Sequence, residues 1–255
     1  MRSFLNIALT AAELSGNLTK EFYNKVNNVK NKGKNYRDLV SKVDIVNETT
    51  ILKTIKSKFK NHNFLGEELG YENNNSKYTW IIDPLDGTVN YTRGISICAI
   101  SISLKLEKTT ILGVVYNPFL NELYYSTKNN TAYLNGSTIK VSKNNMLKNC
   151  LMISALSSES NKNVSKNFAA FRKLNNNSLG VLRLGSAAYG LALLARGSID
   201  VFWGSGLKTW DIDAGLFLAK QAGAVIYEKK KSSNVKVIAC NNKAIYKKIK
   251  KIVQY

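Results

Sequence analysis

The stretch that most restricts how this chain can fold covers residues 80–91, which read WIIDPLDGTVNY. Its apolar beginning is typical of a buried strand. Pro84 interrupts that strand because proline has no backbone N–H to donate to a neighbouring strand. Asp83 and Asp86 therefore emerge together where the strand ends. Gly87 follows at once, and a glycine lets backbone N–H groups approach an anion closely.

Carboxylates beside an anion-binding turn suggest a divalent cation that bridges the protein to a phosphate. Mg²⁺ favours this arrangement, because it takes a few carboxylate ligands and completes its shell with phosphate oxygens and water. A simpler explanation also fits, since Asp, Pro and Gly are the commonest turn residues. Residues 80–91 alone therefore leave a metal site and an ordinary turn both open.

Two further segments place acidic residues at the boundary of a predicted element. Gly66-Glu67-Glu68 ends a short apolar run, and residues 210–215 read WDIDAG and begin a helical pattern. Asp44 opens another segment of helical spacing, where it could serve simply as the helix N-cap.

In their order and spacing, these three motifs resemble the inositol monophosphatase family of Mg²⁺-dependent, Li⁺-sensitive phosphatases. The resemblance extends from about Leu39 to the end of the chain. It implies a layered αβαβα sandwich of the α+β or α/β class, as in the superfamily that also contains fructose-1,6-bisphosphatase. It also implies hydrolysis of a small phosphorylated alcohol, as by an inositol-1-monophosphatase, with Mg²⁺ as the cofactor.

The resemblance further implies roles for individual residues. The implied metal ligands are Glu67, Asp83, the carbonyl of Leu85, Asp86 and Asp211. The implied catalytic residues are Glu67 and the pair Thr88 and Asp44, which orients and deprotonates the attacking water. The implied substrate-binding residues are Asp86, Gly87, Thr88, Gly185, Ser186, Ala187 and Asp211. For Ser186 a purely structural role as a helix N-cap fits equally well.

The leaving-group side of the site departs from the family pattern. Residues 204–206 read GSG where the family's inositol enzymes usually carry a glutamate, and Asp213 stands where an alanine is usual. A polyol is recognised by hydrogen bonds to its hydroxyls, so we expect only a modest preference for inositol monophosphate. Asp213 could replace the missing acceptor, and Lys208 could favour substrates with a second anionic group. The alternative substrates are 3′-phosphoadenosine 5′-phosphate and sugar phosphates such as fructose 1,6-bisphosphate.

The pattern of predicted elements changes near residue 146. Residues 1–145 contain helical spacing at 4–27 and 44–59, followed by short β-branched segments typical of an antiparallel meander. This α+β half carries most of the implied metal ligands. Residues 146–255 alternate strands and helices, which favours an α/β half that supplies the Trp210-Asp211 ligand and the substrate contacts.

The net charge of +20 has two explanations. A basic surface could bind nucleic acid, which leaves an RNA or transcription-machinery interaction as an alternative function. The lysines are scattered, however, which favours a compositional bias over a binding surface, except near the C-terminal end. We therefore expect a small phosphomonoester as the partner, with nucleic acid possible but not favoured, and the family resemblance suggests a homodimer.

The single histidine and the three cysteines exclude several chemistries. A Ser-His-Asp or Cys-His mechanism would have to use His62, which is predicted to be a solvated loop residue. Cys98, Cys150 and Cys240 form no C-x-x-C pair, which favours buried free thiols in a reducing cytoplasm. No apolar run approaches the roughly 20 residues that span a bilayer, so we expect no membrane association.

Overall fold

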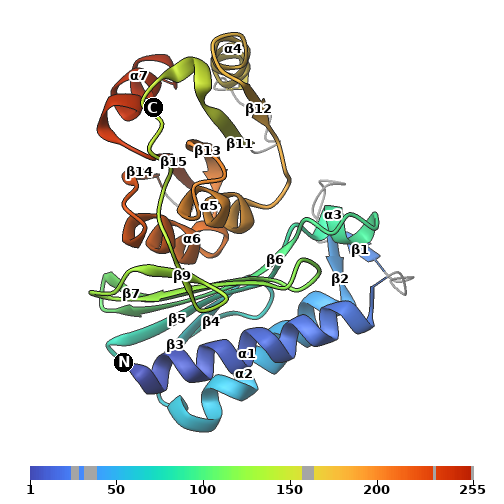
Figure 1. Ribbon diagram of the computed structural model, residues 1–255. Coiled ribbons are helices and arrows are strands. Elements are labelled where there is room, and N and C mark those ends of the chain that lie inside the picture. The colour runs from blue at the N-terminus through green and yellow to red at the C-terminus, as the bar shows by residue number, and fades with distance from the viewer. Residues whose placement is uncertain (24–28, 32–38, 157–163, 232–233, 254–255) are drawn as a thin grey trace.

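The computed structural model describes residues 1–23, 29–31, 39–156, 164–231 and 234–253 (Figure 1). The helices are α1 (Arg2–Glu21), α2 (Lys42–Phe59), α3 (Thr88–Thr92), α4 (Val164–Asn175), α5 (Ala187–Ala195), α6 (Thr209–Gln221) and α7 (Lys243–Val253), with a 3-10 helix η1 at Leu147–Asn149. The strands of the first half are β1 (Val29–Asn31), β2 (Leu39–Ser41), β3 (Asn63–Gly66), β4 (Gly70–Glu72), β5 (Tyr78–Asp86), β6 (Ala99–Leu106), β7 (Thr109–Asn117), β8 (Glu122–Thr127), β9 (Ala132–Leu134) and β10 (Ser137–Ile139). The remaining strands are β11 (Leu151–Leu156), β12 (Gly180–Leu182), β13 (Val201–Leu207), β14 (Val225–Lys231) and β15 (Asn234–Cys240).

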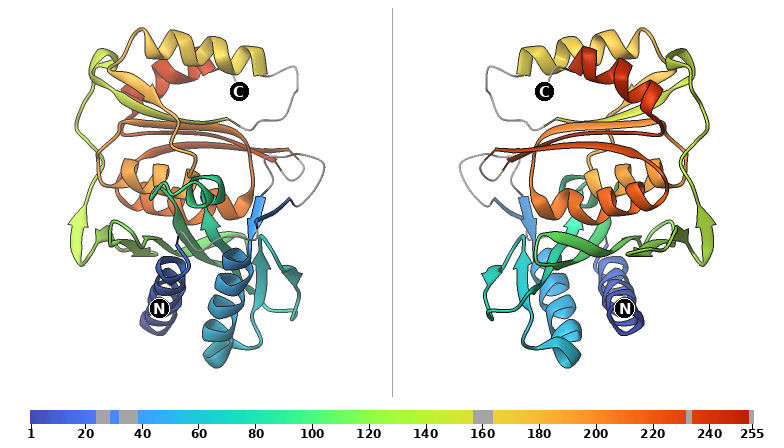
Figure 2. Two further views of the ribbon diagram at one scale, coloured as in Figure 1. Left: turned by 90° about the vertical axis from the view of Figure 1, so that its right-hand side faces the viewer. Right: turned by 90° about the vertical axis from the view of Figure 1, so that its left-hand side faces the viewer.

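The elements stack in five layers, with helices and sheets alternating (Figures 1 and 2). Helices α1 and α2 cover one face of an eight-stranded sheet, and α5 and α6 lie between that sheet and a five-stranded sheet. Helices α4 and α7 form the outermost layer. The predicted αβαβα sandwich is therefore confirmed.

The eight-stranded sheet has the order β10-β9-β8-β7-β6-β5-β3-β4. Adjacent strands of this sheet pair antiparallel, as the predicted meander requires, except that β3 and β5 pair parallel. The parallel pair brings the ends of β3 and β5 to the same edge of the sheet. Glu67, directly after β3, is thereby placed next to the carboxylates at the end of β5.

The five-stranded sheet has the order β12-β11-β13-β15-β14. Strand β11 pairs parallel with β12 and β13, whereas β15 pairs antiparallel with β13 and β14. Between the two sheets, every residue of α5 is buried, which explains why its sequence is apolar all round rather than amphipathic. A boundary between two halves at residues 145 and 146 stays a prediction.

Three local expectations differ from the structure. Helix α2 begins at Lys42, so Asp44 lies inside its first turn rather than at the N-cap. The pattern of residues 199–203 predicts a strand that ends before the glycines, whereas β13 continues to Leu207: Gly204 pairs with Val237, and Gly206 lies in a bulge between Ser205 and Leu207. His62 lies in the loop between α2 and β3 as expected, but it is half-buried rather than solvated: its ring stacks on Phe59 and Tyr78, and its Nδ1 accepts a hydrogen bond of 3.1 Å from Trp80 Nε1.

The cysteines match their prediction, since Cys98, Cys150 and Cys240 are all buried and free. Within the described ranges, no helix combines the length and the apolar character needed to cross a membrane.

Candidate active site

The predicted motif lies where β5 leaves its regular pairing with β6. Asp83 pairs with Ser101 and Asp86 with Ala99, so β5 advances three residues while β6 advances two. This bulge turns both carboxylates toward the centre of the molecule rather than to opposite faces of the sheet. The Oδ1 atom of Asp83 accepts a 3.0 Å hydrogen bond from the N–H of Leu85, which holds the bulge closed.

Gly87 makes the next turn possible. Its φ of +99° lies in the left-handed region, and a Cβ at this position would be 2.9 Å from the carbonyl oxygen of Ile97. Because of the positive φ and this close contact, any residue other than glycine would be strained at position 87. The turn directs the chain into α3 and points the Thr88 side chain back toward β5.

Thr88 and Asp44 meet in space as the family resemblance implies. The Thr88 hydroxyl lies 3.2 Å from Oδ1 of Asp44 and 3.1 Å from the carbonyl oxygen of Leu85. Asp44 is only 1% exposed on the inner face of α2. The Thr88 hydroxyl has one proton, so it can donate to only one of these two acceptors at a time.

Asp86 connects the two halves of the chain. Its Oδ2 accepts hydrogen bonds from Ser186 Oγ at 2.7 Å and from the N–H of Ala188 at 2.6 Å. Ser186 is also the N-cap of α5 and accepts from the N–H of Tyr189. The role of Ser186 as the N-cap of α5 is therefore compatible with its predicted role in substrate binding. The positive end of the α5 dipole favours the ionised form of the Asp86 carboxylate.

Asp211 occupies the first turn of α6, as the sequence predicts. Its Oδ2 accepts a 2.8 Å hydrogen bond from the N–H of Lys208, which caps the helix. Asp83, Asp86 and Asp211 thus share one feature: the hydrogen bonds described for each carboxylate use one of its two oxygens. Such an arrangement orients a carboxylate without using all of its acceptor sites.

Glu67 sits on a turn that a second glutamate supports. Glu48 of α2 is fully buried, and its carboxylate accepts hydrogen bonds from the N–H of Glu68 at 2.8 Å and of Leu69 at 3.0 Å. A Cβ on Gly66 would lie 1.8 Å from Glu48 Oε1, so the glycine is what lets this carboxylate reach the turn. Glu48 has no role predicted from the sequence. Its signal is the spacing: Glu48 follows Asp44 by one helical turn on the same buried face of α2.

A second residue without a predicted role is Asn90, on α3. Its side-chain amide donates to the carbonyl oxygens of Ile97 and Leu184, each at 2.7 Å. The turn at Gly185 lies directly against this amide, at a φ of +79°. Asn90 therefore joins the motif at residues 80–91 to the start of α5, and its place within that motif was the available signal.

The carboxylates crowd one another. Burial, and then the negative charges of Glu67, Asp86 and Asp211, raise the pKa of Asp83 well above its usual range. Burial also raises the pKa of Asp86, although the hydrogen bonds from Ser186 and Ala188 oppose this effect. For Asp211, burial and the charge of Asp86 raise the pKa. A bound cation would remove the repulsion and favour the ionised forms.

The donor set fits a hard cation. Carboxylate and carbonyl oxygens are the ligands of Mg²⁺, whereas zinc favours His or Cys. Among the residues that the structure describes, no three His, Cys, Asp or Glu side chains are already close enough together to hold a metal ion. The carboxylates that act on one another are Glu67, Asp83, Asp86 and Asp211, and these are the ones that would hold Mg²⁺.

A pocket of about 590 Å³ opens beside these carboxylates. Its described wall contains these predicted residues: Asp86, Gly185, Ser186, Ala187 and Asp211. The wall does not include the other predicted residues, which are Asp44, Glu67, Asp83, Leu85, Gly87 and Thr88. Arg183 also lines the pocket and donates to the carbonyl oxygen of Leu156 at 3.2 Å.

Asp213 does not take the role expected from the sequence, whereas the expected role of Lys208 stays a prediction. Asp213 forms a 2.7 Å ion pair with Lys105 and accepts hydrogen bonds from Ser103 and Thr110 on the eight-stranded sheet. It therefore does not replace the missing acceptor in the pocket beside Asp86. Lys208 donates from Nζ to Asn234 at 3.0 Å and is not part of the described pocket wall.

The chain is similar to known proteins over most of its length. The family model of the inositol monophosphatase family matches residues 1–255. A fructose-1,6-bisphosphatase/inositol-1-monophosphatase of Aquifex aeolicus is 36% identical over 248 residues, which cover 96% of this chain and 93% of the relative. The Nus factor SuhB of Escherichia coli K12 is 34% identical over 227 residues, or 89% of this chain and 85% of the relative.

Solved structures give the same result for the fold. The extragenic suppressor protein SuhB of Bartonella henselae superposes with a TM-score of 0.91 at 28% identity, covering 99% of this chain and 98% of the other. The IMPase of Thermotoga maritima superposes with a TM-score of 0.89 at 28% identity, covering 99% and 97%. This chain belongs to the inositol monophosphatase family, whose enzymes hydrolyse phosphate monoesters.

Proposed function

We propose that the chain is a Mg²⁺-dependent phosphatase acting on a small phosphorylated alcohol. One observation carries the proposal: Glu67, Asp86 and Asp211 come from separate parts of the sequence, yet they lie close enough to Asp83 for their charges, together with burial, to raise its pKa. Buried like charges are costly unless a cation neutralises them. The Leu85 carbonyl beside Asp83 and Asp86 completes the proposed set of oxygen ligands.

Mg²⁺ in this site would stabilise the charge on the phosphate and lower the pKa of a bound water. The chain's own residues orient the reactants. Thr88 Oγ donates its proton to Asp44 when the Leu85 carbonyl serves as a ligand, because Asp44 is then the remaining acceptor. A lone pair of Thr88 Oγ can then accept a hydrogen bond from the attacking water, and as the proton of the water moves to Thr88 Oγ, the hydroxyl proton of Thr88 moves to Asp44. The N–H groups of Gly87 and Thr88 are proposed to bind phosphate oxygens.

The alcohol of the substrate would occupy the pocket between Asp86 and Arg183. Residues 204–206 contain no carboxylate, and the carboxylate of Asp213 is hydrogen-bonded to Ser103 instead of facing this pocket. The site therefore discriminates only weakly between alcohols through hydrogen bonds. The names of the relatives support a broad substrate range, because one of them combines a fructose-1,6-bisphosphatase and an inositol-1-monophosphatase. Competition between inositol 1-phosphate, fructose 1,6-bisphosphate, glycerol 2-phosphate and 3′-phosphoadenosine 5′-phosphate tests this. A preference of a thousandfold for one substrate would contradict it.

Phosphate release with and without Mg²⁺ tests the proposed activity. Asp211→Asn should lose most turnover, because it removes a ligand charge while keeping the size of the side chain. Asp213→Asn is the matched control on the same helix and should keep turnover within a few-fold of wild type. Li⁺ should inhibit the wild type. Full activity in excess chelator, or equal activity of both variants, would overturn the assignment.

The assembly and location of the chain are part of the same proposal. The family resemblance supports a homodimer, which light scattering of the purified protein would detect. The free thiols Cys98, Cys150 and Cys240 support a reducing, cytoplasmic location.

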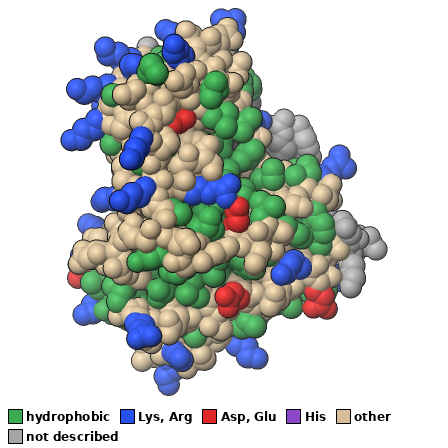
Figure 3. All heavy atoms as spheres, viewed as in Figure 1, with side chains coloured by type: hydrophobic (Ala, Val, Ile, Leu, Met, Phe, Trp, Pro, Cys, Tyr) green, Lys and Arg blue, Asp and Glu red, His purple; other side chains and the backbone are tan. Residues whose placement is uncertain are grey.

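A second function is favoured by the outermost helical layer. Helices α4 and α7 pack together, and neither contains an acidic residue. Figure 3 shows lysine and arginine side chains standing out over this part of the molecule. The exposed basic residues of the layer are Lys166, Arg172, Lys173, Lys243, Lys247, Lys248, Lys250 and Lys251. Some relatives are named Nus factors, and we infer that this layer could bind the phosphate backbone of RNA.

Titration of a labelled single-stranded RNA tests the second function. Combining Lys247→Glu, Lys248→Glu and Lys251→Glu should weaken RNA binding about tenfold or more. Each lost contact between a lysine and a phosphate removes part of the salt-dependent free energy of binding. The matched control combines Lys53→Glu, Lys58→Glu and Lys60→Glu, which make the same charge change on the opposite side of the molecule. Equal loss in both triple variants would mean that only the net charge matters, and the proposal would fail.

A further inference from the structure

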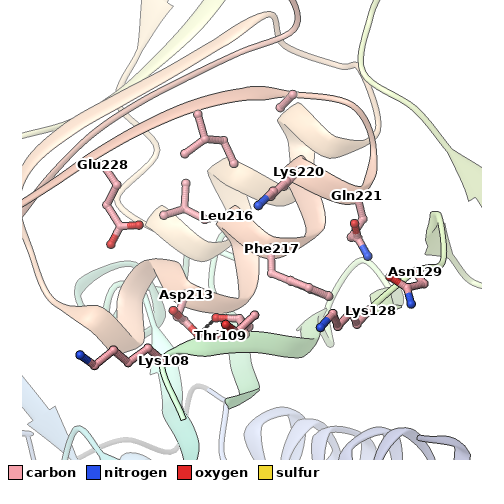
Figure 4. A pocket seen from close by; sticks show the side chains of 13 residues that line it. Lys108, Thr109, Lys128, Asn129, Asp213, Leu216, Phe217, Lys220, Gln221 and Glu228 are labelled. Atoms are coloured by element: carbon pink, nitrogen blue, oxygen red, sulfur yellow. Dashed lines mark hydrogen bonds between the residues drawn. The ribbon is translucent and has the colours of Figure 1, made fainter. Parts of the chain in front are cut away.

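A second pocket, of about 690 Å³, lies on the far side of α6 from Asp211. Residues from the β6–β7 turn, β7, the end of β8, α6 and β14 line it (Figure 4). Its volume is in the range of pockets that bind small organic ligands. The proposed phosphatase activity uses none of its residues.

The charges on the wall of this pocket are unbalanced. Its two acidic residues already have cationic partners: Asp213 pairs with Lys105 at 2.7 Å, and Glu228 pairs with Lys230 at 3.4 Å. Both partners lie outside the wall. By contrast, Lys128 and Lys220, which are on it, form no ion pair or side-chain hydrogen bond with any residue that the structure describes. A recess lined by unneutralised charge of one sign concentrates counter-ions.

The arrangement within the pocket separates polar from apolar contacts. Figure 4 shows Lys128, Lys220, Asn129 and Gln221 toward one end, with Glu228 and Lys108 toward the opposite end. Phe217 lies between the two lysines and supplies apolar wall, together with Leu216 and Ile226. The lysines suit phosphate or carboxylate groups, and the apolar wall suits a ring or a short hydrocarbon chain.

We propose that this pocket binds a small organic polyanion, such as a nucleoside phosphate, with its charged groups on Lys128 and Lys220. Asn129 and the Gln221 side chain add polar contacts at the same end. Ligand binding here is independent of the proposed metal site, because the two sites share α6 but no side chain.

Calorimetric titration with adenosine 5′-(β,γ-imido)triphosphate tests the proposal on the full chain. The titration is run with Mg²⁺ and with excess chelator, since the metal site needs its cation and this pocket does not. We expect one binding event per chain in chelator. Combining Lys128→Glu and Lys220→Glu should weaken that event at least tenfold, whereas Asp211→Asn should leave it unchanged.

Combining Lys53→Glu and Lys58→Glu changes the net charge equally but leaves the pocket intact, so it should preserve binding. Lys128 and Lys220 are both exposed, which makes their substitution compatible with folding. The proposal is wrong if the chelated protein binds no probe, or if the two double variants bind it equally. Neither outcome bears on the phosphatase assay.

Discussion

At the scale of single residues, the site depends on side chains that hold backbone rather than substrate. Glu48 accepts hydrogen bonds from two N–H groups of the turn that presents Glu67, and Asn90 donates to the carbonyl oxygens of Ile97 and Leu184. Buried polar groups of this kind are stabilising only while their partners remain. The geometry of the carboxylates therefore rests on residues that need not contact the substrate.

Glu48 is the residue whose loss should show this most clearly. Glu48→Ala removes the charged acceptor of two part-buried N–H groups, and a hydrogen bond to a charged group contributes about 1.5–3 kcal/mol. The Mg²⁺ concentration for half-maximal activity should rise by about tenfold or more, because Glu67 is no longer held in place. Glu48→Gln keeps one acceptor oxygen and should recover part of both effects.

Thermal unfolding and Mg²⁺-dependent kinetics measure the two effects separately. Glu21→Gln is a suitable control, since Glu21 is exposed at the end of α1. If Glu48→Ala lowers stability but leaves the Mg²⁺ dependence unchanged, Glu48 is structural only.

At the scale of elements, the site forms where helices begin and strands end, whereas the hydrophobic cores form where the faces of helices and sheets pack together. Helices α3, α5 and α6 all begin beside the carboxylates, and their first turns supply Thr88, Ala188 and Asp211. Far from the site, α1, α2 and β5 pack through a cluster of aromatic rings that includes Phe4, Phe59 and His62.

This cluster makes the packing sensitive to pH. Burial lowers the pKa of His62, so the folded state prefers the neutral ring, whose Nδ1 accepts from Trp80. The unfolded state binds the proton more readily, with a pKa of about 6.5. The stability that the neutral ring contributes is complete above that pH and is lost as the pH falls toward the lowered folded value.

His62→Gln removes the titration while keeping an acceptor for Trp80. The variant should therefore lose less stability than the wild type between about pH 7 and pH 5. Denaturant unfolding across this range measures the difference. An identical pH dependence in both proteins would show that His62 titrates as it does in the unfolded chain.

At the scale of the whole molecule, the layered fold brings carboxylates from both parts of the chain to one place. The end of β5 carries Asp83 and Asp86, and α6 of the layer between the sheets carries Asp211. The fold thus places like charges close together in a protein whose overall charge is +20. A cation bound there should act as a link between the layers.

Mg²⁺ should consequently raise the midpoint of thermal unfolding. A ligand present at 100 times its dissociation constant adds about 2.7 kcal/mol. That corresponds to a shift of about 5 °C or more in a chain of this size. Asp211→Asn should reduce this shift, and without metal it should be at least as stable as the wild type because it relieves repulsion. Asp213→Asn should retain the full response to Mg²⁺. No shift in the wild type at saturating Mg²⁺ would contradict a metal site between the layers.

The local features of the molecule were predictable from the sequence. The strand, proline and glycine of residues 80–91 restrict the backbone regardless of context, and the alternation of strands and helices after residue 146 indicates the α/β arrangement. The three motifs were sufficient to identify the family, because their residue types and spacing carry its chemistry. The positions of Asp211 at the start of a helix and of Ser186 at an N-cap follow from the same local rules.

Other features were decided only by tertiary structure. Asp213 follows Asp211 by two residues, and helical geometry turns its side chain away, toward Lys105 on the sheet rather than toward the pocket. Glu48 and His62 look like ordinary surface residues in the sequence, but each is surrounded by groups from distant segments. A residue's type and spacing determine what it can bind. Its partners depend on which segments the packed layers bring against it, and this cannot be read from the neighbouring sequence.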